Sequence, residues 1–409
     1  MNYAVIDREE IPMLFIPNVK QTVFAEKSRQ KEYALYIHIP FCKRKCHFCS
    51  IPVLTFKDET AIDSYLDKLI DEIKMNMNNL KGCVLKAVHI GGGTPSLLSV
   101  PQIKRLLDVI IGQFGDGLPE IVFEANPESL TQDKIDILAG YQNVTLNIGI
   151  QTFNSHRLRE INRMEDVNHI KRCLRYALGK KNLDVGIDLI VGLPNSTLSD
   201  VKYDLEAVNE FGMKNIFIYP YRSEKKSFFF DYHKEVNYLS QDELIKIMEY
   251  VENEMYKGGF IAKSMYYWTR ENKPLYLYSA HQIDGGEWIG VGAGAYSYLN
   301  FSVSRNSSII EEDCSNATGC NKMRCELVRQ NITSQLIWDL TFMIKKNDFD
   351  AERIKEKYGK IAEQYLHEIL EKLEENGYSQ QKNNKIRLSA KGKVLLDRVE
   401  SLIQEVVLR

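Results

Sequence analysis

Residues 34–49 read Ala-Leu-Tyr-Ile-His-Ile-Pro-Phe-Cys-Lys-Arg-Lys-Cys-His-Phe-Cys, and the rest of the chain is organised around this stretch. Its first part, Leu35–Ile39, is a short apolar run that predicts a buried strand. Directly after it, Cys42, Cys46 and Cys49 follow one another in a C-x3-C-x2-C spacing. The stretch therefore predicts a strand whose end carries three thiols on one short loop.

Three kinds of site could use three neighbouring thiols. We do not expect disulfides, because no secretory signal precedes the stretch and a reducing cytoplasm is the default. A zinc site needs a fourth Cys or His, and His47 lies directly beside Cys46, where it is a poor fourth ligand. An iron–sulfur cluster suits soft thiolate ligands, and three cysteines leave one iron of a four-iron cluster open to a substrate or cofactor.

Length and composition narrow the class of protein. The chain has 409 residues, of which 44% are hydrophobic and 26% are charged, which allows one large and one smaller domain. A net charge of −2 favours neither nucleic acid nor an anionic membrane. We see no apolar run as long as a membrane span. We therefore expect a cytoplasmic protein with no nucleic-acid or membrane partner.

Six strands are predicted to alternate with helices up to about residue 225. The expected strands are Leu35–Ile39, Leu85–Ile90, Glu120–Glu124, Val144–Ile150, Leu183–Val191 and Asn215–Tyr219. The expected helices lie at about 62–73, 100–114, 131–139, 155–162, 166–178 and 198–211. This order is typical of right-handed βαβ units around a parallel sheet, so we predict an α/β fold with a partial (β/α)6 barrel.

Polar and glycine-rich signals recur where these strands end. They include the three cysteines, Gly91-Gly92-Gly93, Glu124, Gln151 and Asp188. In barrels of this kind the carboxyl ends of the strands build the active site. We therefore expect these residues on one face of the sheet.

The remaining chain divides into smaller parts. We expect residues 1–30 to be a lead-in, 31–225 the partial barrel, 226–300 an extension that completes the sheet, and 301–409 a mostly helical, winged-helix-like C-terminal domain. Within the extension, 241–257 predicts a helix, and 285–298 is rich in glycine and aromatic residues that suit either a ligand or close strand packing. Cys314, Cys320 and Cys325 form either a second metal site or, as we favour, incidental thiols on a loop and a helix start.

Together, several motifs resemble one superfamily. The spacing of Cys42, Cys46 and Cys49 resembles that of the radical S-adenosylmethionine (SAM) enzymes. Five further motifs are similar to those of the oxygen-independent coproporphyrinogen III oxidase family, which includes haem chaperones and class C radical SAM methyltransferases. They start at Tyr36 (YIHIPFC), Gly91 (GGGTPSL), Glu124 (EANP), Gly149 (GIQTF) and Asp188 (DLIVGLP).

The resemblance implies a radical SAM barrel with a 4Fe–4S cluster on the three cysteines and one or two bound SAM molecules. It also implies which residues contact the cofactor: Tyr36, Phe48, Gly92, Gly93, Thr94, Glu124, Gln151, Arg163 and Asp188. Among these, Arg163 is expected to hold the SAM carboxylate, because a guanidinium matches a carboxylate bidentately. The expected chemistry is reductive cleavage of SAM to a 5′-deoxyadenosyl radical that abstracts hydrogen, with a reductant protein such as flavodoxin or ferredoxin as partner.

Three branches of the family stay open. The porphyrinogen oxidases carry a fourth cysteine two positions after the third, where this chain has Ile51. The haem chaperones carry a His-Asn-x-x-Tyr-Trp motif that is absent here, although His281 is available as a haem ligand. The methyltransferase branch tolerates both differences. We therefore favour hydrogen abstraction or methyl or methylene transfer on a small conjugated substrate, with a haem chaperone second and a coproporphyrinogen oxidase in porphyrin biosynthesis third.

Overall fold

The computed structural model describes residues 32–409 except 52, 56–58, 81, 114–118, 232–235, 273–275, 301, 307–323, 330 and 383–384. The fold is built around a twisted sheet of twelve strands, in the order β14-β13-β12-β11-β1-β4-β5-β6-β7-β8-β10-β9. The seven central strands are parallel: β11 (Glu287–Val291), β1 (Glu32–Ile39), β4 (Val84–Gly92), β5 (Glu120–Ala125), β6 (Val144–Gln151), β7 (Asp184–Val191) and β8 (Asn215–Pro220). All six predicted barrel strands are confirmed as neighbours in this order.

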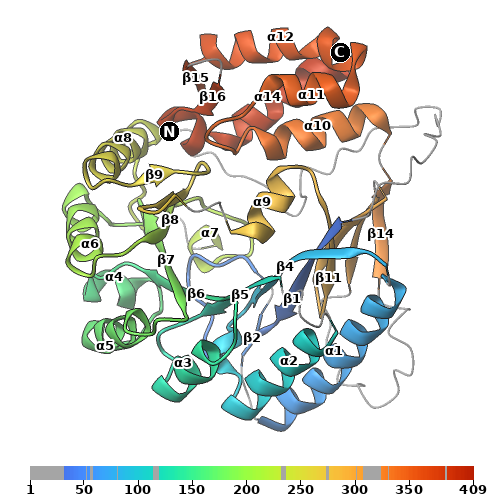
Figure 1. Ribbon diagram of the computed structural model, residues 1–409. Helices are drawn as coiled ribbons and strands as arrows, with labels where there is room; N and C mark the ends of the chain where they lie inside the picture. Colours follow the sequence, from blue (N-terminus) through green and yellow to red (C-terminus); the bar gives the residue numbers. More distant parts are fainter. Residues whose placement is uncertain are drawn as a thin grey trace.

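Antiparallel strands extend both ends of the parallel set. On one side lie β12 (Tyr296–Leu299), β13 (Ser302–Asn306) and β14 (Arg324–Arg329), and on the other β10 (Tyr267–Thr269) and β9 (Ile261–Ala262). Within the described residues the two end strands do not pair with each other, so the sheet curves without closing (Figure 1). The seventh parallel strand, β11, comes from the glycine- and aromatic-rich stretch, for which the sequence left a ligand contact and strand packing equally open.

Helices cover the outer face of the curved sheet (Figure 1). They are α1 (Glu59–Asn79), α2 (Val100–Gly112), α3 (Gln132–Ala139), α4 (Ser155–Glu160), α5 (Val167–Leu178), α6 (Leu198–Glu210) and α8 (Gln241–Lys257), with the short η1 (Pro95–Leu97), α7 (Phe228–Asp231) and α9 (Leu277–Ile283) between strands. Alternate residues of β1 show why the layers form. Leu35, Ile37 and Ile39 are fully buried in the main core, whereas Tyr36 and His38 alternate with them and line the inner cavity.

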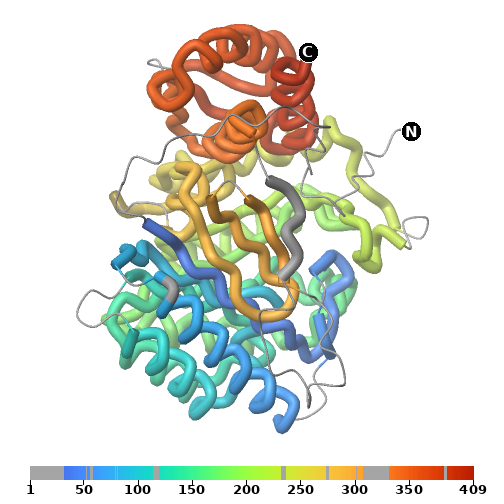
Figure 2. The backbone as a smooth tube through the Cα atoms, turned by 90° about the vertical axis from the view of Figure 1, so that its right-hand side faces the viewer, coloured from blue at the N-terminus to red at the C-terminus, as the bar shows by residue number. Residues whose placement is uncertain are grey.

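The C-terminal helices form a separate layer above one edge of the sheet (Figure 2). They are α10 (Ile332–Met343), α11 (Ala351–Tyr358), α12 (Lys360–Glu375), α13 (Ala390–Val394) and α14 (Leu396–Leu408), with the hairpin β15 (Ser379–Lys382) and β16 (Lys385–Leu388). The backbone carbonyl of Lys393 anchors the layer by accepting hydrogen bonds from Arg222 and Tyr266, at 2.8 and 3.0 Å. A hairpin stands where the sequence predicted one strand, because β15 is too polar to give an apolar strand signal.

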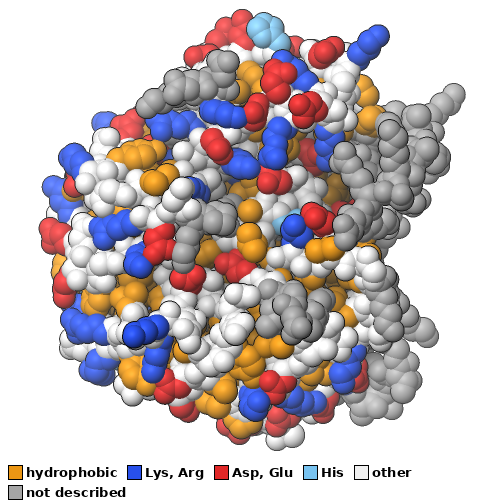
Figure 3. Space-filling view, in the orientation of Figure 1, with side chains coloured by type: hydrophobic (Ala, Val, Ile, Leu, Met, Phe, Trp, Pro, Cys, Tyr) orange, Lys and Arg blue, Asp and Glu red, His pale blue; other side chains and the backbone are white. Residues whose placement is uncertain are grey.

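Two surface findings bear on possible partners. Figure 3 shows acidic and basic side chains mixed across one face, most densely over the C-terminal helices, with no field of a single sign. None of the helices in the described part of the chain combines the length and the apolar character that crossing a membrane requires.

Candidate active site

The three cysteines lie on a loop, here called the cysteine loop (residues 42–50), between the short strands β2 (Phe41–Cys42) and β3 (Leu54–Thr55). All three thiols are free and half-buried. The loop turns tightly, because the Cys49 amide donates to the Cys46 carbonyl oxygen at 3.1 Å. The segment just after α4 holds the middle of the cysteine loop in place, since Asn162 Nδ2 donates to the Lys45 carbonyl oxygen at 2.8 Å.

The thiols have polar neighbours suited to thiolate ligands. Thr94 Oγ1 donates to Cys42 Sγ at 3.3 Å, and Arg163 Nε donates to Cys46 Sγ at 3.4 Å. Burial raises the pKa of Cys42, and it raises the pKa of Cys49 to about 12. Thr94 and Arg163 thus supply the donors that would stabilise sulfur ligands if the loop held a metal cluster.

Two observations bear on whether the cysteine loop could bind a single metal ion. Within the described ranges, no three His, Cys, Asp or Glu side chains converge closely enough to bind one ion. His47 is engaged elsewhere: its Nδ1 lies 2.7 Å from the Glu160 carbonyl oxygen, and its ring stacks on Phe228 with centroids 4.1 Å apart. His47 therefore does not stand ready as a fourth zinc ligand, and a cluster on the three thiols stays the prediction.

The glycine stretch after β4 brings backbone close to the cysteine loop. The Gly93 amide donates to the Ile39 carbonyl oxygen at 2.8 Å, and a Cβ there would lie 2.6 Å from the Phe41 carbonyl oxygen. Gly92 has φ +105°, and a Cβ on it would lie 2.5 Å from the His38 ring. Only glycine fits at these two positions, because a side chain would collide with backbone or with a buried ring.

Polar side chains from neighbouring strands line the inside of the sheet. Glu124 accepts from His89 Nε2 at 2.8 Å, and Asp188 accepts from Asn147 Nδ2 at 2.9 and 3.0 Å. The pKa of Asp188 is raised to about 7, mainly by burial and in part by the nearby Glu124, against the lowering effect of the Asn147 hydrogen bonds. The strand register explains the grouping, because Glu124 stands opposite Asn147 in the paired strands.

Gln151 and Arg163 lie where β6 leads into α4 and the segment after it. Gln151 is buried and has φ +72°, a left-handed conformation that is costly for a residue other than glycine and concentrates at functional sites. Arg163 is buried, and besides Cys46 it donates to the Gly149 carbonyl oxygen and to Glu165 Oε1, the latter at 3.3 Å. Its expected contact with a SAM carboxylate stays a prediction.

Tyr36 and Phe48 lie on different sides of the site. Tyr36 OH is 3.0 Å from His38 Nδ1, and its ring stacks on His89, with centroids 5.8 Å apart and planes 27° apart. Phe48 is partly buried against the main core. The structure thus groups Cys42 with Thr94 and Cys46 with Arg163, whereas Phe48, on the cysteine loop itself, packs partly buried against the core.

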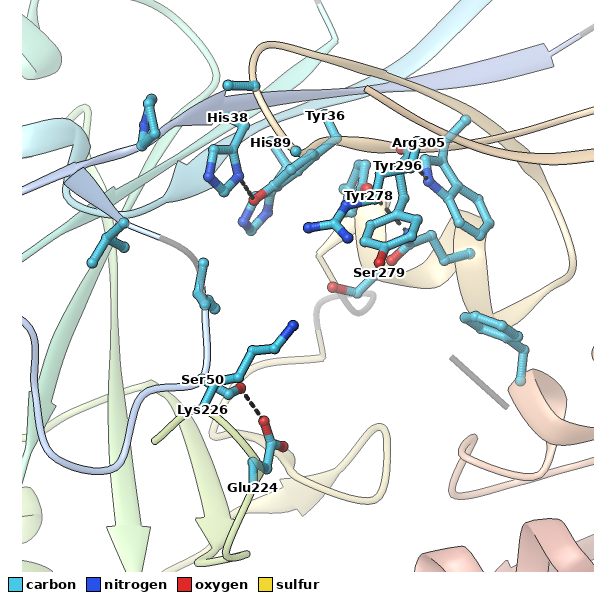
Figure 4. A pocket seen from close by; sticks show the side chains of 18 of the residues that line it. Tyr36, His38, Ser50, His89, Glu224, Lys226, Tyr278, Ser279, Tyr296 and Arg305 are labelled. Atoms are coloured by element: carbon cyan, nitrogen blue, oxygen red, sulfur yellow. Dashed lines mark hydrogen bonds between the residues drawn. The ribbon is translucent and has the colours of Figure 1, made fainter. Parts of the chain in front are cut away.

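A cavity of about 950 Å³ opens beside the cysteine loop (Figure 4). Three parts of the chain line it: Lys45 and Ser50 of the cysteine loop together with the following Ile51, a polar wall of Tyr36, His38 and His89, and an aromatic wall of Tyr278, Trp288, Tyr296, Trp338 and Phe342. Arg305, Lys345 and Gln404 also line it. The volume lies at the upper end of the range for small-molecule sites.

Sequence reasoning missed several of these lining residues. His89 had a weak signal. It lies two residues before Gly91 on β4, and it is the register partner of Tyr36 on the neighbouring strand β1. Arg305, Trp338 and Phe342 had none, since no local pattern tells that β13 and α10 approach the strand ends.

Two further sequence hypotheses concern cysteine and histidine. Cys314 and Cys320 lie outside the described residues, and Cys325 falls on strand β14 instead of the expected helix start. The Nε2 atom of His281 is 2.8 Å from the Glu287 carbonyl oxygen, and this residue is not among those that line the cavity. His281 therefore has a structural partner within its own helix–strand connection.

Comparisons with known proteins agree with this geometry. The model of the radical SAM superfamily matches residues 36–208. The chain is 31% identical over 283 residues to the heme chaperone HemW of Lactococcus lactis subsp. lactis (strain IL1403), covering 66% of this chain and 70% of that protein. It is 24% identical over 391 residues to the oxygen-independent coproporphyrinogen III oxidase of Salmonella typhimurium (strain LT2), covering 90% of this chain and 84% of that protein.

A solved structure shows the same fold. Coproporphyrinogen III oxidase (HemN) from Escherichia coli superposes with a TM-score of 0.76 at 22% identity, over 91% of this chain and 90% of that one. The predicted α/β architecture, with its mostly parallel sheet and helical C-terminal region, is therefore confirmed. From the cysteine loop, the strand-end motifs and these likenesses together, we conclude that the chain belongs to the radical SAM family that includes oxygen-independent coproporphyrinogen III oxidase and the heme chaperone HemW.

Proposed function

We propose that this protein is a radical SAM enzyme that abstracts hydrogen from, or transfers a methyl or methylene group to, a small conjugated molecule held in the cavity. Membership of the family implies a 4Fe–4S cluster and SAM. One observation carries the proposal: a single cavity is lined by Lys45 and Ser50 of the cysteine loop, by the polar wall and by the aromatic wall, although none of the three cysteines lines it. The loop that would hold the cluster thus borders the space in which a conjugated substrate would lie.

Within that proposal each group of residues has a task. Cys42, Cys46 and Cys49 would hold the cluster, while Arg163 and Thr94 hydrogen-bond two of the sulfurs. When bound, the cluster and SAM would supply the electron and the hydrogen-abstracting radical. The remaining cofactor contacts would come from strand ends, at Tyr36, Gly92, Gly93, Glu124, Gln151 and Asp188, with Phe48 packing beside the loop.

The polar interior suits a positively charged cofactor. Glu124 on β5 and Asp188 on β7 place carboxyl groups on two strands separated only by β6, and Glu124 acts electrostatically on Asp188. A cationic group such as a sulfonium or an ammonium would relieve their mutual repulsion. Surrounding apolar strands exclude water, which protects a reactive radical from side reactions.

The test is an anaerobic reaction with dithionite and SAM after cluster reconstitution. We expect about four irons per chain and formation of 5′-deoxyadenosine, both lost in the Cys42→Ala/Cys46→Ala/Cys49→Ala variant. S-adenosylhomocysteine in addition to 5′-deoxyadenosine would identify methyl transfer of the class C type. Full iron content in the triple variant would refute this assignment of the cluster.

A haem chaperone is the second candidate, and its support is the 31% identity to HemW together with the aromatic cavity. A haem titration tests it: a Soret band at one haem per chain, with neither 5′-deoxyadenosine nor S-adenosylhomocysteine formed, would favour the chaperone.

The oxidase reaction is tested by anaerobic incubation with coproporphyrinogen III, in which release of CO2 is measured. Ile51 in place of a fourth cysteine is unfavourable for this reaction.

A further inference from the structure

The strand end that carries Gln151 has an irregular backbone. In the pairing of β6 with β7 the register shifts between Gly149 and Gln151, so Ile150 is an extra residue in the ladder. Gln151 then has φ +72°, in the left-handed region that is unfavourable for a residue with a side chain. A backbone of this kind persists only where the surrounding structure holds it, so its neighbours need to be identified.

A buried carboxyl group on α6 holds the two residues that follow Gln151. Asp204 is 4% exposed and lies on the buried, otherwise apolar face of this helix. Its Oδ1 atom accepts hydrogen bonds from Thr152 Oγ1 at 3.1 Å and from the Phe153 amide at 2.6 Å. Asp204 thus ties the chain directly after the left-handed residue to a helix of the outer layer.

Further contacts from α6 extend this support along the turn between β6 and α4. Thr152 Oγ1 accepts a hydrogen bond from the Asn154 amide at 3.1 Å. Asp200, on the preceding turn of α6, accepts one from Asn154 Nδ2 at 2.7 Å. The Phe153 ring stacks on Phe211 at the end of α6, with centroids 6.0 Å apart and planes 8° apart. The helix therefore fixes the direction in which β6 ends.

The environment of Asp204 shows what the turn requires of it. Its pKa is raised to about 7, mainly by burial, against the lowering effect of the hydrogen bonds from Phe153 and Thr152. Both donors that it binds, a hydroxyl and a backbone amide, are uncharged. The turn therefore depends on a correctly placed acceptor at residue 204 more than on a negative charge.

The same strand end is connected to the cysteine loop. Gly149 stands opposite Asp188 in the paired strands, and its carbonyl oxygen accepts a hydrogen bond from Arg163. Arg163 also donates to Cys46 Sγ at 3.4 Å. Because Gln151 follows Gly149 by two residues, a shift of this strand end would move the Gln151 side chain relative to the cysteine loop.

We infer that Asp204 is a positioning residue, which holds the end of β6 so that the Gln151 side chain stays in place for the cofactor. This inference rests on the proposed function, in which Gln151 contacts SAM. Asp204 acts from the outer helical layer through Thr152 and the Phe153 amide, and it has no part in the chemistry itself.

A double-mutant cycle on SAM affinity tests this role. Equilibrium dialysis of SAM with the full-length, cluster-reconstituted protein gives the dissociation constant. We expect Asp204→Ala and Gln151→Ala each to weaken SAM binding by about 10- to 30-fold. The double variant should lie within about threefold of the weaker single variant, because one residue acts through the other. Asp204→Asn should stay within about threefold of wild type, since its side-chain oxygen can accept both hydrogen bonds.

Val208→Ala is the matched control for loss of stability. Val208 is 1% exposed on the same face of α6, and its side chain offers no acceptor to the turn. This variant should lower the urea midpoint of unfolding, as Asp204→Ala does, but should change SAM binding by less than about threefold. If Asp204→Ala does not fold, Thr152→Val takes its place in the cycle, with an expected loss of about 3- to 10-fold, because it removes one of the two donors.

Additive losses in the double variant, equal losses in Asp204→Ala and Val208→Ala, or no rescue by Asp204→Asn would each overturn the positioning role. Formation of 5′-deoxyadenosine by wild type is measured on the same samples. If wild type binds SAM and forms this product while the losses are additive, only the positioning role is refuted. If wild type neither binds SAM nor forms the product, the proposed function fails, and this inference fails with it.

Discussion

The polar wall and the aromatic wall of the cavity differ in how their side chains are partnered. On the polar wall, Tyr36 meets His38 at 3.0 Å and His89 meets Glu124 at 2.8 Å, although His38 Nε2 has no partner. On the aromatic wall, Arg305 and Trp338 offer donors that nothing in the described chain accepts. Most hydrogen-bonding groups of the polar wall are thus held by neighbours within the chain, whereas these two donors of the aromatic wall are not.

The largest effect is expected from removing one of the three cysteines, which should abolish cofactor chemistry without changing the aromatic wall. Cys46→Ala removes one cluster ligand, so we expect loss of the reconstituted iron and a fall in 5′-deoxyadenosine to the background of the no-enzyme reaction. Binding of mesoporphyrin IX, a planar conjugated probe of the cavity, should stay within about threefold of wild type, since the aromatic wall does not contact Cys46. Cys83→Ala, at a half-buried free thiol before β4, is the control and should keep its iron. Joint loss of iron and porphyrin binding would show that the walls are not independent.

Gly92→Ala should destabilise the polar wall, because the added methyl group would clash with the His38 ring. The new methyl group would lie 2.5 Å from the His38 ring at a residue with φ +105°. We expect a loss of about 3 kcal/mol in the free energy of unfolding, measured by urea denaturation. Gly82→Ala is matched, because Gly82 has φ +87° but nothing within 4 Å of a Cβ, so it should cost only about 1 kcal/mol. Similar losses in the two variants would mean that His38 moves aside freely.

The polar wall should also respond to pH through His38. The pKa of His38 is lowered to about 4, mainly by burial, with Glu124 opposing the shift and Arg305 adding to it, whereas the unfolded histidine titrates near 6.5. Stability from the neutral ring is therefore present above pH 6.5 and is lost as the pH falls toward 4, because the unfolded state gains the proton first. Between pH 7 and pH 4.5, wild type should lose roughly 2 kcal/mol more than His38→Gln. Parallel pH profiles of unfolding free energy would contradict this.

The smallest effect is expected at the cavity mouth. Ile51 is 40% exposed and stands where the porphyrinogen oxidases carry a fourth cysteine. Ile51→Cys should change the free energy of unfolding by less than about 0.5 kcal/mol, as surface substitutions usually do, and should leave the iron content unchanged. A rise in iron, or a new visible absorption band relative to an Ile51→Val control, would show that the fourth thiol joins the cluster.

The walls also differ in how far the sequence could predict them. The polar wall and the residues behind it lie on β1, β4, β5, β6 and β7, whose order in the sheet follows their order in the chain. Of the wall itself the sequence predicted Tyr36, through the family resemblance, and missed His38 and His89, whereas the strand-end motifs pointed to Glu124, Gln151 and Asp188 behind it. The aromatic wall joins α9, β11, β12 and α10, and its composition depends on pairings between distant segments that no local pattern encodes.

The same contrast explains the remaining differences. The sequence predicted the helix at 241–257 to the residue, because its capping box and apolar periodicity are local. It did not predict that β11 pairs in parallel with β1, since that pairing joins Leu35 to Ile289 across most of the chain. Arg305 could not be recognised as a site residue, because only this pairing brings β12 and β13 beside the strand ends.

The pairing of β1 with β11 also sets an order of events during synthesis. The strand that leads into the cysteine loop meets β4 early, but its other partner emerges from the ribosome about 250 residues later. At about 5 to 20 residues per second, β1 remains an open edge for roughly 10 to 50 seconds. During that interval the three thiols exist without β11 and the aromatic wall that it carries, so a nascent chain presents Cys42, Cys46 and Cys49 before its cavity has formed.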